Sequence, residues 1–228
     1  MISDRKKIIL KAIIKEYVRN AAPVSSGFLV EKCKLGVSPA TIRNEMAELE
    51  DEGYIIQPHT SAGRVPTELA YNLELEDLLL EKNLLKEAES QILDNLFSYD
   101  ESSFKQTAKA IAELSGCAVF WAFHKNDLYY TGLSHLFSQP EFRQSEVVYD
   151  VSVIIDHMEE IIDDIFEKVK QEEQVLIGSN NPFGVFLSTV LVKYKQADRS
   201  GIFGLIGPIR MDYRRNLSLV NYIKNKFK

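Results

Sequence analysis

The chain has 228 residues, of which 45% are hydrophobic, and its formal net charge is −6. This length fits one or two globular domains, and no apolar run approaches the roughly 20 residues that a membrane-spanning helix needs. The negative net charge does not indicate a nucleic-acid partner, so a prediction of DNA binding must rest on local basic side chains. Cys33 and Cys117 lie far apart without a Cys-x-x-Cys motif, as expected of reduced thiols in a cytoplasmic protein.

The N-terminal segment predicts two helices and a turn. Asp4 can cap the first helix, which carries apolar residues at helical spacing and should end near Pro23. Ser25 or Ser26 then starts a short second helix. A glycine-containing turn is expected at residues 35–36, before a third helix.

The third predicted helix begins at a definite place, because Ser38 can cap free backbone amides and Pro39 suits the first helical position. Counted at 100° per residue, its inward face is apolar and its outward face is small and polar. The inward face should hold Ile42, Met46 and Leu49, and the outward face should hold Ala40, Arg43, Asn44 and Ala47. Since Asn can pair with adenine and Arg with guanine, the outward face could read bases in a DNA groove.

The same helix becomes acidic between Glu45 and Glu52, where phosphates would be repelled. Only its first two turns can therefore face DNA, as in the second helix of a helix-turn-helix. The alternative is an amphipathic surface helix with a solvated acidic face.

A wing is predicted after this helix. The run Tyr54–Gln57 is β-prone, and a glycine-containing loop with a lone arginine, Arg64, follows it. This pattern predicts a strand pair with a basic tip that contacts a phosphate or the minor groove. The alternative for Arg64 is a surface salt bridge to the acidic helix.

Two stretches resemble the bacterial heat-inducible transcription repressors, the HrcA family. They are Ser38–Asn44, with the sequence SPATIRN, and Gln57–Thr67, with the sequence QPHTSAGRVPT. The resemblance returns at Gly132–Phe142 and Ile206–Tyr213, which look like the family's GAF-like domain. It implies a sequence-specific repressor of chaperone genes that binds an inverted-repeat operator as a homodimer. It also implies dependence on the GroE chaperonin as a partner.

The expected DNA contacts lie in the second helix, the third helix and the loop. They are Ser25, Ser26, Ser38, Ala40, Thr41, Arg43, Asn44, His59, Thr60, Ser61, Gly63 and Arg64. Asn44 and Arg43 are expected to touch bases, and Ser38 and Thr41 the DNA backbone. The alternative for Arg43 is a phosphate contact from the flank of the helix.

One departure from the family concerns dimerisation. HrcA proteins usually carry a dimerisation domain inserted within the GAF-like part, and here only residues 124–127 separate two apolar runs. The insert is expected to be absent, so the dimer seam should come from another part of the chain. The candidates are a leucine-rich helix from Leu78 to Leu96, which we prefer, and the aromatic run near Phe120, Trp121 and Phe123.

The remaining pattern completes an α+β protein. Thr67 or Asn72 can start one long helix that runs to Leu96. Further helices are expected at 103–114, 151–170 and 212–226, and strands at 117–123, 128–131, 174–177, 186–195 and 201–206. The expected domains are a winged helix-turn-helix at 1–70, a helical connector at 71–102 and a GAF-like α/β sheet domain at 103–228.

Nothing in the sequence calls for catalysis, a metal or a cofactor. Gly201, Gly204 and Gly207 lack the Gly-x-Gly start of a phosphate cradle, and a bend in a strand is expected there. The histidines show no metal-ligand spacing with the cysteines. Two other functions stay open: a regulator whose GAF-like domain senses a small molecule, and an enzyme fused to a winged domain, for which no nucleotide or biotin motif occurs.

Overall fold

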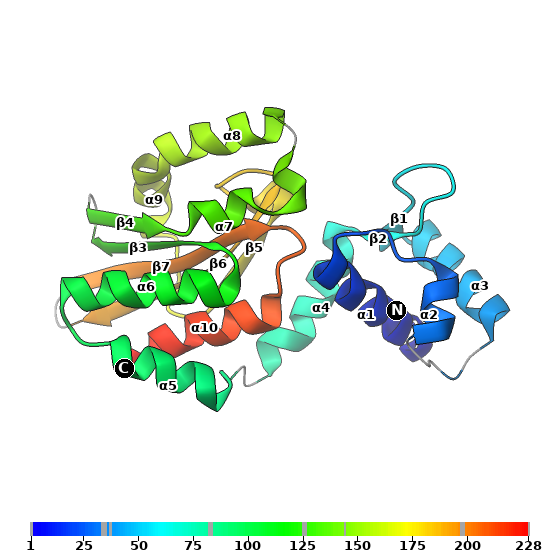
Figure 1. Cartoon of the computed structure of the whole chain (residues 1–228), viewed down its shortest axis with the longest axis horizontal. Helices are drawn as coiled ribbons and strands as arrows, with labels where there is room; N and C mark the ends of the chain where they lie inside the picture. The colour runs from blue at the N-terminus through cyan, green and yellow to red at the C-terminus, as the bar shows by residue number, and fades with distance from the viewer. Residues whose placement is uncertain are drawn as a thin grey trace. The chain divides into compact units, whose positions relative to one another are not determined.

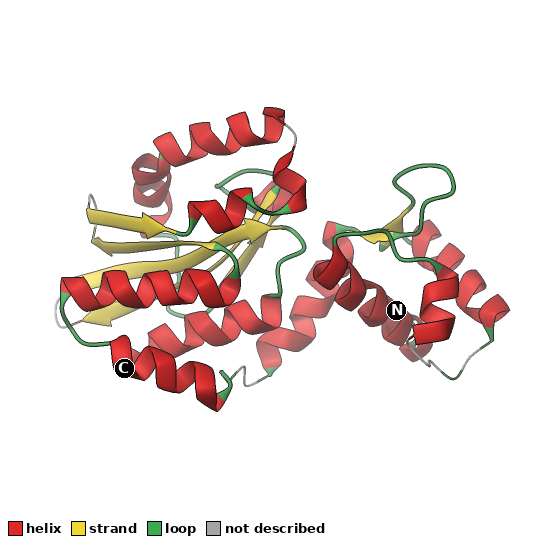
Figure 2. Ribbon diagram, in the orientation of Figure 1, coloured by secondary structure: helices red, strands yellow, loops and turns green. Residues whose placement is uncertain are grey.

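The computed structural model of the chain describes residues 2–32, 36, 38–81, 84–124, 127–143, 145–196 and 199–227. Contacts divide the chain into two compact units, Met1–Leu80 and Glu81–Lys228. The first unit is mainly helical with two short strands, and the second is built around one sheet, so the chain is α+β (Figures 1 and 2). Among the described residues, no helix is both long and apolar enough to cross a membrane.

The N-terminal unit packs helices around a small apolar core. Its elements are α1 (Asp4–Asn20), α2 (Ser26–Lys32), α3 (Pro39–Asp51), β1 (Ile55–Ile56), β2 (Val65–Pro66) and α4 (Glu68–Leu80). Strands β1 and β2 pair antiparallel, and the loop between them rises above the pair in Figure 1. Ile13, Leu29, Ile42 and Leu49 are all fully buried in the core.

Serine hydroxyls fix where the first three helices begin. Ser25 accepts a hydrogen bond from the backbone N–H of Phe28 at 3.2 Å, as expected for the start of α2. The cap of α1, however, is Ser3, which accepts from the backbone N–H of Lys6. The prediction that Asp4 caps the helix was wrong by one residue. Asp4 instead lies in the first turn, where its negative charge interacts favourably with the helix dipole. Cys33 and Leu35 lie outside the described residues.

The base of the loop between β1 and β2 is joined to the segment between α1 and α2. Val24 and Arg64 exchange both backbone hydrogen bonds, at 2.9 and 2.8 Å. A Cβ atom at Gly63 would lie 2.5 Å from the backbone of Val24. Glycine is therefore required for this close approach of two backbones.

The expected single helix from Thr67 or Asn72 to Leu96 was wrong. Helix α4 ends at Leu80, and α5 (Glu87–Leu96) begins after Lys86, whose backbone is extended. The two helices belong to different units. Leucines of α4 are buried in the first unit and Leu93 of α5 is buried in the second, so each half serves its own core. The residues of the expected connector are thus divided between the two units.

An antiparallel sheet in the order β4-β3-β7-β6-β5 forms the centre of the second unit. The strands are β3 (Ala118–His124), β4 (Asp127–Thr131), β5 (Gln174–Ile177), β6 (Leu187–Gln196) and β7 (Arg199–Pro208), close to the expected positions. Helices α6 (Glu101–Ser115) and α10 (Tyr213–Lys226) cover one face (Figure 1).

The opposite face of the sheet carries α7 (Leu133–Phe137), which the sequence did not predict, and two further helices. These are α8 (Ser145–Asp156) and α9 (Met158–Phe166), with short 3-10 turns at Pro140–Arg143 and Gly178–Asn180. The expected helix 151–170 was wrong as one element, because the chain breaks at His157. Apolar residues of both helices pack on this face around Phe120 and Phe183.

Strand β7 runs without interruption through its glycines and pairs with β6 in one continuous register. Gly204 lies opposite Phe120 in the sheet, and a Cβ atom there would collide with the phenylalanine ring. A Cβ at Gly201 would likewise meet the hydroxyl of Tyr194. These glycines therefore make room for aromatic rings that lie across the sheet.

The aromatic run of β3 is core. Phe120 and Trp121 are fully buried, and the indole N–H of Trp121 donates to the hydroxyl of Tyr194 at 2.8 Å. Trp121 also packs edge-on against Phe203 at a centroid distance of 4.9 Å. The expectation that this run forms an exposed dimer patch was wrong, because neighbouring rings of the same chain already cover it.

Candidate nucleic-acid interface

The exposed face of α3 is the one expected from the sequence. Ala40, Arg43, Asn44 and Ala47 are exposed, whereas Ile42 and Leu49 are fully buried and Met46 is 6% exposed. The two alanines leave the backbone of this face accessible beside an amide and a guanidinium. A helix with this surface can approach base edges closely in a major groove.

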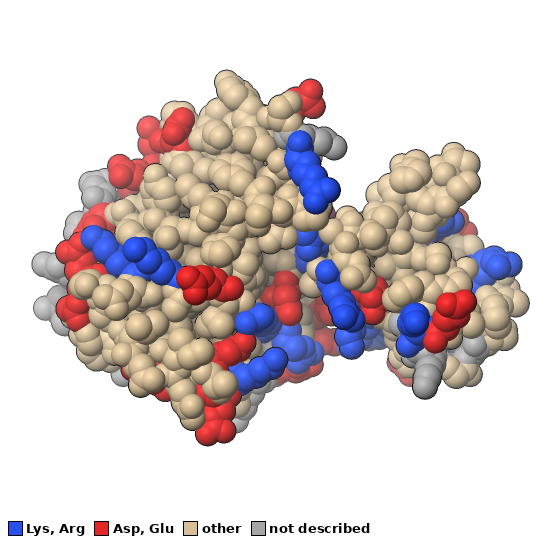
Figure 3. Space-filling model, viewed as in Figure 1, with Lys and Arg blue, Asp and Glu red and all other residues tan. Residues whose placement is uncertain are grey.

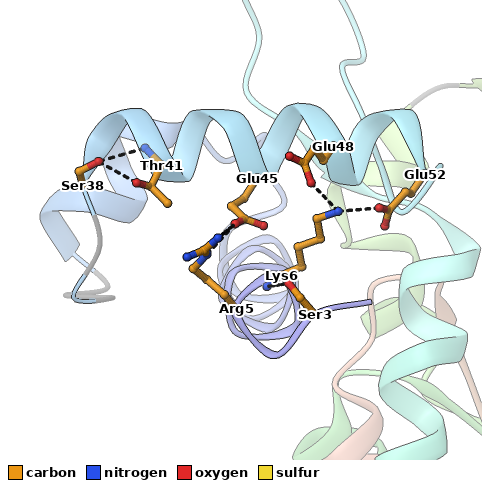
Figure 4. A network of polar contacts seen from close by, with 8 residues as sticks. All are labelled: Ser3, Arg5, Lys6, Ser38, Thr41, Glu45, Glu48 and Glu52. Atoms are coloured by element: carbon orange, nitrogen blue, oxygen red, sulfur yellow. Dashed lines mark hydrogen bonds and ion pairs between the residues drawn. The ribbon is translucent and has the colours of Figure 1, made fainter. Parts of the chain in front are cut away.

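The hydroxyls at the start of α3 are already engaged in capping. Ser38 accepts a hydrogen bond from the backbone N–H of Thr41 at 3.1 Å, and the two side-chain oxygens lie 2.8 Å apart (Figure 4). Both groups remain near the surface, next to the positive end of the helix dipole. A phosphate is a suitable ligand for a helix end of this kind.

Basic residues of α1 neutralise the acidic half of α3. Arg5 pairs with Glu45 at 2.5 Å, and the ammonium of Lys6 lies 2.7 Å from Glu48 and 2.6 Å from Glu52 (Figure 4). Glu45 and Lys6 are buried, at 6% and 9% exposure. The alternative of a solvated acidic face is thus wrong for Glu45, whereas Glu48 and Glu52 remain exposed, at 60% and 41%, and their charges are partly compensated by Lys6.

The Lys6 contacts shift the protonation equilibria of both partners. Hydrogen bonds that the ammonium of Lys6 donates to Glu48 and Glu52 raise the pKa of Lys6 above its ordinary value of 10.5. The hydrogen bond from Lys6 in turn lowers the pKa of Glu48 below its ordinary value of 4.5. Both groups are therefore charged at neutral pH, and α1 holds α3 by ionic contacts as well as by apolar packing.

The loop between β1 and β2 has no Lys, Arg, Asp or Glu at its exposed end. His59, Thr60 and Ser61 are exposed, and Ser61 has a positive φ of 69°. Figure 3 shows no charged side chain on the part of this loop that it presents. Gly63 lies at the base of the loop, against Val24.

Arg64 does not form a basic tip. It directly precedes β2, and its guanidinium pairs with Glu50 of α3 at 2.8 Å. The alternative interpretation, a salt bridge to the acidic helix, is therefore the arrangement that the structure contains. Whether Arg64 also contacts DNA stays a prediction, as do the contacts expected of Ser25, which caps α2, and Ser26, which begins it.

Sequence reasoning missed Arg5 and Lys6 as parts of this region. Their partners are distant in sequence, and Arg5 lies 40 residues from Glu45. The available signal was a run of basic residues, 5–7, in a chain whose third helix is acidic. Opposite charges on two helices that share a core are candidates for pairing, but the pattern does not say which residues meet.

Cys117 is an inert thiol of the second unit. It is 2% exposed, and burial raises the pKa of its thiol to about 11, so the thiol stays protonated at neutral pH. Within the part of the chain that the structure describes, no three His, Cys, Asp or Glu side chains gather as metal ligands would.

A family model described as the HrcA protein C-terminal domain matches residues 67–217, which is more than half of the chain. The chain belongs to the HrcA family. Two curated relatives named heat-inducible transcription repressor HrcA come from Clostridium perfringens (44% identical over 119 residues) and a Nocardioides species (46% over 118 residues). Each alignment covers 50% of this chain and 35% of the relative, so the chain matches about a third of the length of these HrcA proteins.

An HrcA protein of Halalkalibacterium halodurans aligns over 98% of this chain and 96% of its own length, at 25% identity. The 329 aligned positions exceed the 228 residues of this chain by 101, so at least 101 positions of that relative have no counterpart here. A crystal structure described as that of a hypothetical protein has the same fold. Its TM-score is 0.83 at 19% sequence identity, and the match covers 100% of this chain and 98% of that one.

Proposed function

We propose that this chain is a transcription repressor of heat-shock chaperone genes. The N-terminal unit acts as a winged helix-turn-helix domain that inserts the start of α3 into the major groove of an operator. The exposed loop of residues 57–64 is the wing and lies along the adjacent backbone or minor groove. The second unit is a GAF-like domain, and the protein works in the cytoplasm, beside the bacterial chromosome.

One observation carries this proposal. The start of α3 exposes Arg43 and Asn44 between two alanines, while the acidic end of the same helix is paired with α1 and with Arg64. Base-reading groups are thus free on the surface, and most of the charges that would repel DNA are compensated. The names of the relatives support the same function, since they describe heat-inducible transcription repressors.

The sheet face that α7, α8 and α9 cover gives no support to the alternative of a small-molecule sensor. The sheet face under α7, α8 and α9 is filled by side chains, among which Phe120 and Phe183 are fully buried and their ring centroids lie 5.4 Å apart. A ligand on this face would have to displace packed aromatic rings, and core packing resists such changes.

The proposal includes a homodimer on an inverted repeat, because two heads about one helical turn apart need a two-fold arrangement. Strands β3 and β4 are connected through residues 125 and 126 alone, and the Halalkalibacterium relative has at least 101 positions without a counterpart in this chain. Both facts support the expectation that this chain lacks the family's inserted dimerisation domain. Regulation by GroE rests on the family resemblance and is proposed on that ground only.

The test is DNase footprinting on the promoter of the organism's own chaperone operon, with random duplex DNA as competitor. Protection of an inverted repeat that survives excess competitor supports the proposal. Equal affinity for promoter and random DNA would contradict it. Addition of GroE chaperonin to the same assay should increase the protected fraction if the proposed regulation holds.

A further inference from the structure

Glu50 connects α3 to both ends of the loop between β1 and β2. Its Oε1 accepts a hydrogen bond from the backbone N–H of Gln57 at 3.1 Å, where the loop begins. Its Oε2 accepts from the Nε of Arg64 at 2.8 Å, where the loop ends, and the Nη2 of Arg64 lies equally close. One carboxylate on α3 therefore closes the loop.

Further contacts hold the same loop. The side-chain amide of Gln57 donates to the carbonyl of Ala62 at 3.0 Å, and the backbone of Arg64 pairs with Val24 in both directions. The side chains of Arg64 and Glu50 are 23% and 31% exposed. An ion pair that is half-withdrawn from water is screened less by salt than one on the open surface.

We propose that Glu50 is a positioning residue for DNA binding, and that Arg64 serves this contact instead of touching DNA. The proposal rests on the proposed function of the chain. By tying both ends of the loop to α3, Glu50 fixes the angle between the loop and the helix before DNA arrives. A loop that is ordered in advance loses less conformational entropy on binding, so affinity is higher.

The charges favour this assignment over a phosphate contact by Arg64. The Nε and Nη2 groups of Arg64 are engaged with Glu50, so only its remaining N–H groups could contact a phosphate, and that phosphate would lie close to the Glu50 carboxylate, which repels it. With the pair intact, the loop still presents His59, Thr60 and Ser61, which are exposed. Hydroxyl groups and backbone N–H groups of such a loop can contact phosphates and sugars.

A charge swap tests the proposal. We expect Glu50→Arg and Arg64→Glu each to weaken binding to the footprinted operator about tenfold, because like charges then face each other at the base of the loop. The double variant, which restores an ion pair with reversed direction, should return to within about threefold of the unchanged protein. If the double variant binds as weakly as either single variant, Arg64 contacts DNA itself, and the proposal is overturned.

Amide hydrogen exchange without DNA supplies a second, independent measurement. Both single variants should speed exchange across residues 57–64, and the double variant should slow it again. Unchanged exchange in the single variants would mean that Glu50 does not hold the loop. Because the exchange measurement needs no DNA, it tests the role of Glu50 even if the unchanged protein shows no preference for the operator. That lack of preference would contradict the proposed function but not the role of Glu50 in holding the loop. Thermal melts followed by circular dichroism identify any variant that fails to fold.

A matched pair of variants separates positioning from simple charge. Glu50→Gln and Asp51→Asn each remove one negative charge from the end of α3, and Asp51 is exposed with no contact to the loop among the described residues. We expect Asp51→Asn to leave loop exchange unchanged and operator affinity equal or higher. Glu50→Gln should speed loop exchange and lower affinity. The same response in both variants would overturn the proposal.

Discussion

Asn44 is the residue whose side chain can distinguish bases most directly. It lies on the exposed face of α3, and an amide can make two hydrogen bonds to adenine. We expect Asn44→Ala to cost about 1–3 kcal/mol of binding free energy on the operator and little on random DNA. Parallel titrations with the two duplexes measure the difference. An equal loss on both would show that Asn44 contacts only the DNA backbone.

Lys6 should make the stability of the N-terminal unit depend on pH. Since Lys6 holds the pKa of Glu48 below 4.5, the folded state gains stability from this pair above pH 4.5 and loses it as pH falls through the lowered value. The raised pKa of Lys6 gives the opposite pH dependence. Its contribution to the stability of the folded state is complete below pH 10.5 and is lost as pH rises through the raised pKa. Lys6→Met should therefore lower the melting temperature most near neutral pH.

Thermal melts of Lys6→Met between acid and neutral pH check this expectation. The difference in melting temperature from the unchanged protein should shrink as Glu48 becomes protonated. Lys15→Met is the control, because Lys15 is exposed on the same helix and forms no ion pair among the described residues. A difference for Lys6→Met that stays constant with pH would assign the effect to packing of the lysine stem.

At the scale of elements, the loop between β1 and β2 depends on its glycine. Gly63→Ala would place a methyl group against the backbone of Val24, which cannot move like a flexible side chain. We expect a loss of about 1–3 kcal/mol in the free energy of unfolding, as for other overpacked sites. Denaturant melts measure it, and DNA binding should weaken in parallel as the loop is displaced.

Gly27→Ala provides the comparison for this prediction. A Cβ atom at Gly27, in α2, would meet only the hydroxyl of Ser25 at an ordinary contact distance of 3.9 Å. Because alanine has a higher helix propensity than glycine, the variant should be as stable as the unchanged protein or up to about 1 kcal/mol more stable. Similar destabilisation by both substitutions would show that close approach to Val24 is not the cause.

The sequence predicted elements wherever the signal was local. Ser38 with Pro39, and Asp212 before α10, mark helix starts within three residues of the groups that they cap. The break between α4 and α5 was missed because leucines continue at helical spacing on both sides, and no proline or glycine marks the end. Only the separate cores of the two units decide where each helix stops.

The candidate site shows the same limit. The exposed face of α3 could be read from helical periodicity, since it depends only on which side carries Ile42 and Leu49. Helical periodicity could not identify the partners of Glu45, Glu48 and Glu50, because those partners lie on α1 and at the end of the loop. For Arg64 the sequence left two interpretations open, and the folded position next to Glu50 favours the less obvious one.

At the scale of the whole molecule, the dimer seam must use residues that the two units leave exposed. Leu78 is 3% exposed and is unsuitable as a test, whereas Leu80 and Leu84 are 89% and 74% exposed. We expect a dimer mass by light scattering at micromolar concentration, and a monomer mass for Leu80→Glu or Leu84→Glu. Large apolar side chains that are exposed to solvent favour such an interface.

Ile8→Glu is the control for this prediction, because Ile8 is also exposed, at 55%, but lies on α1. It should leave the mass unchanged. If the unchanged protein has a monomer mass, dimers form only when the protein binds DNA. A dimer mass that survives both leucine substitutions would move the seam to another surface.

The glycines of β7 have a consequence for genetics. Every amino-acid substitution of glycine adds at least a Cβ atom, and at Gly201 and Gly204 that atom collides with a neighbouring strand or ring. Under the proposed repressor function, a selection for mutants that express chaperones without heat should therefore recover changes at these codons, even though β7 belongs to the unit without α3. Such alleles would act by lowering the amount of folded protein, and their map positions would not mark the surface that reads DNA.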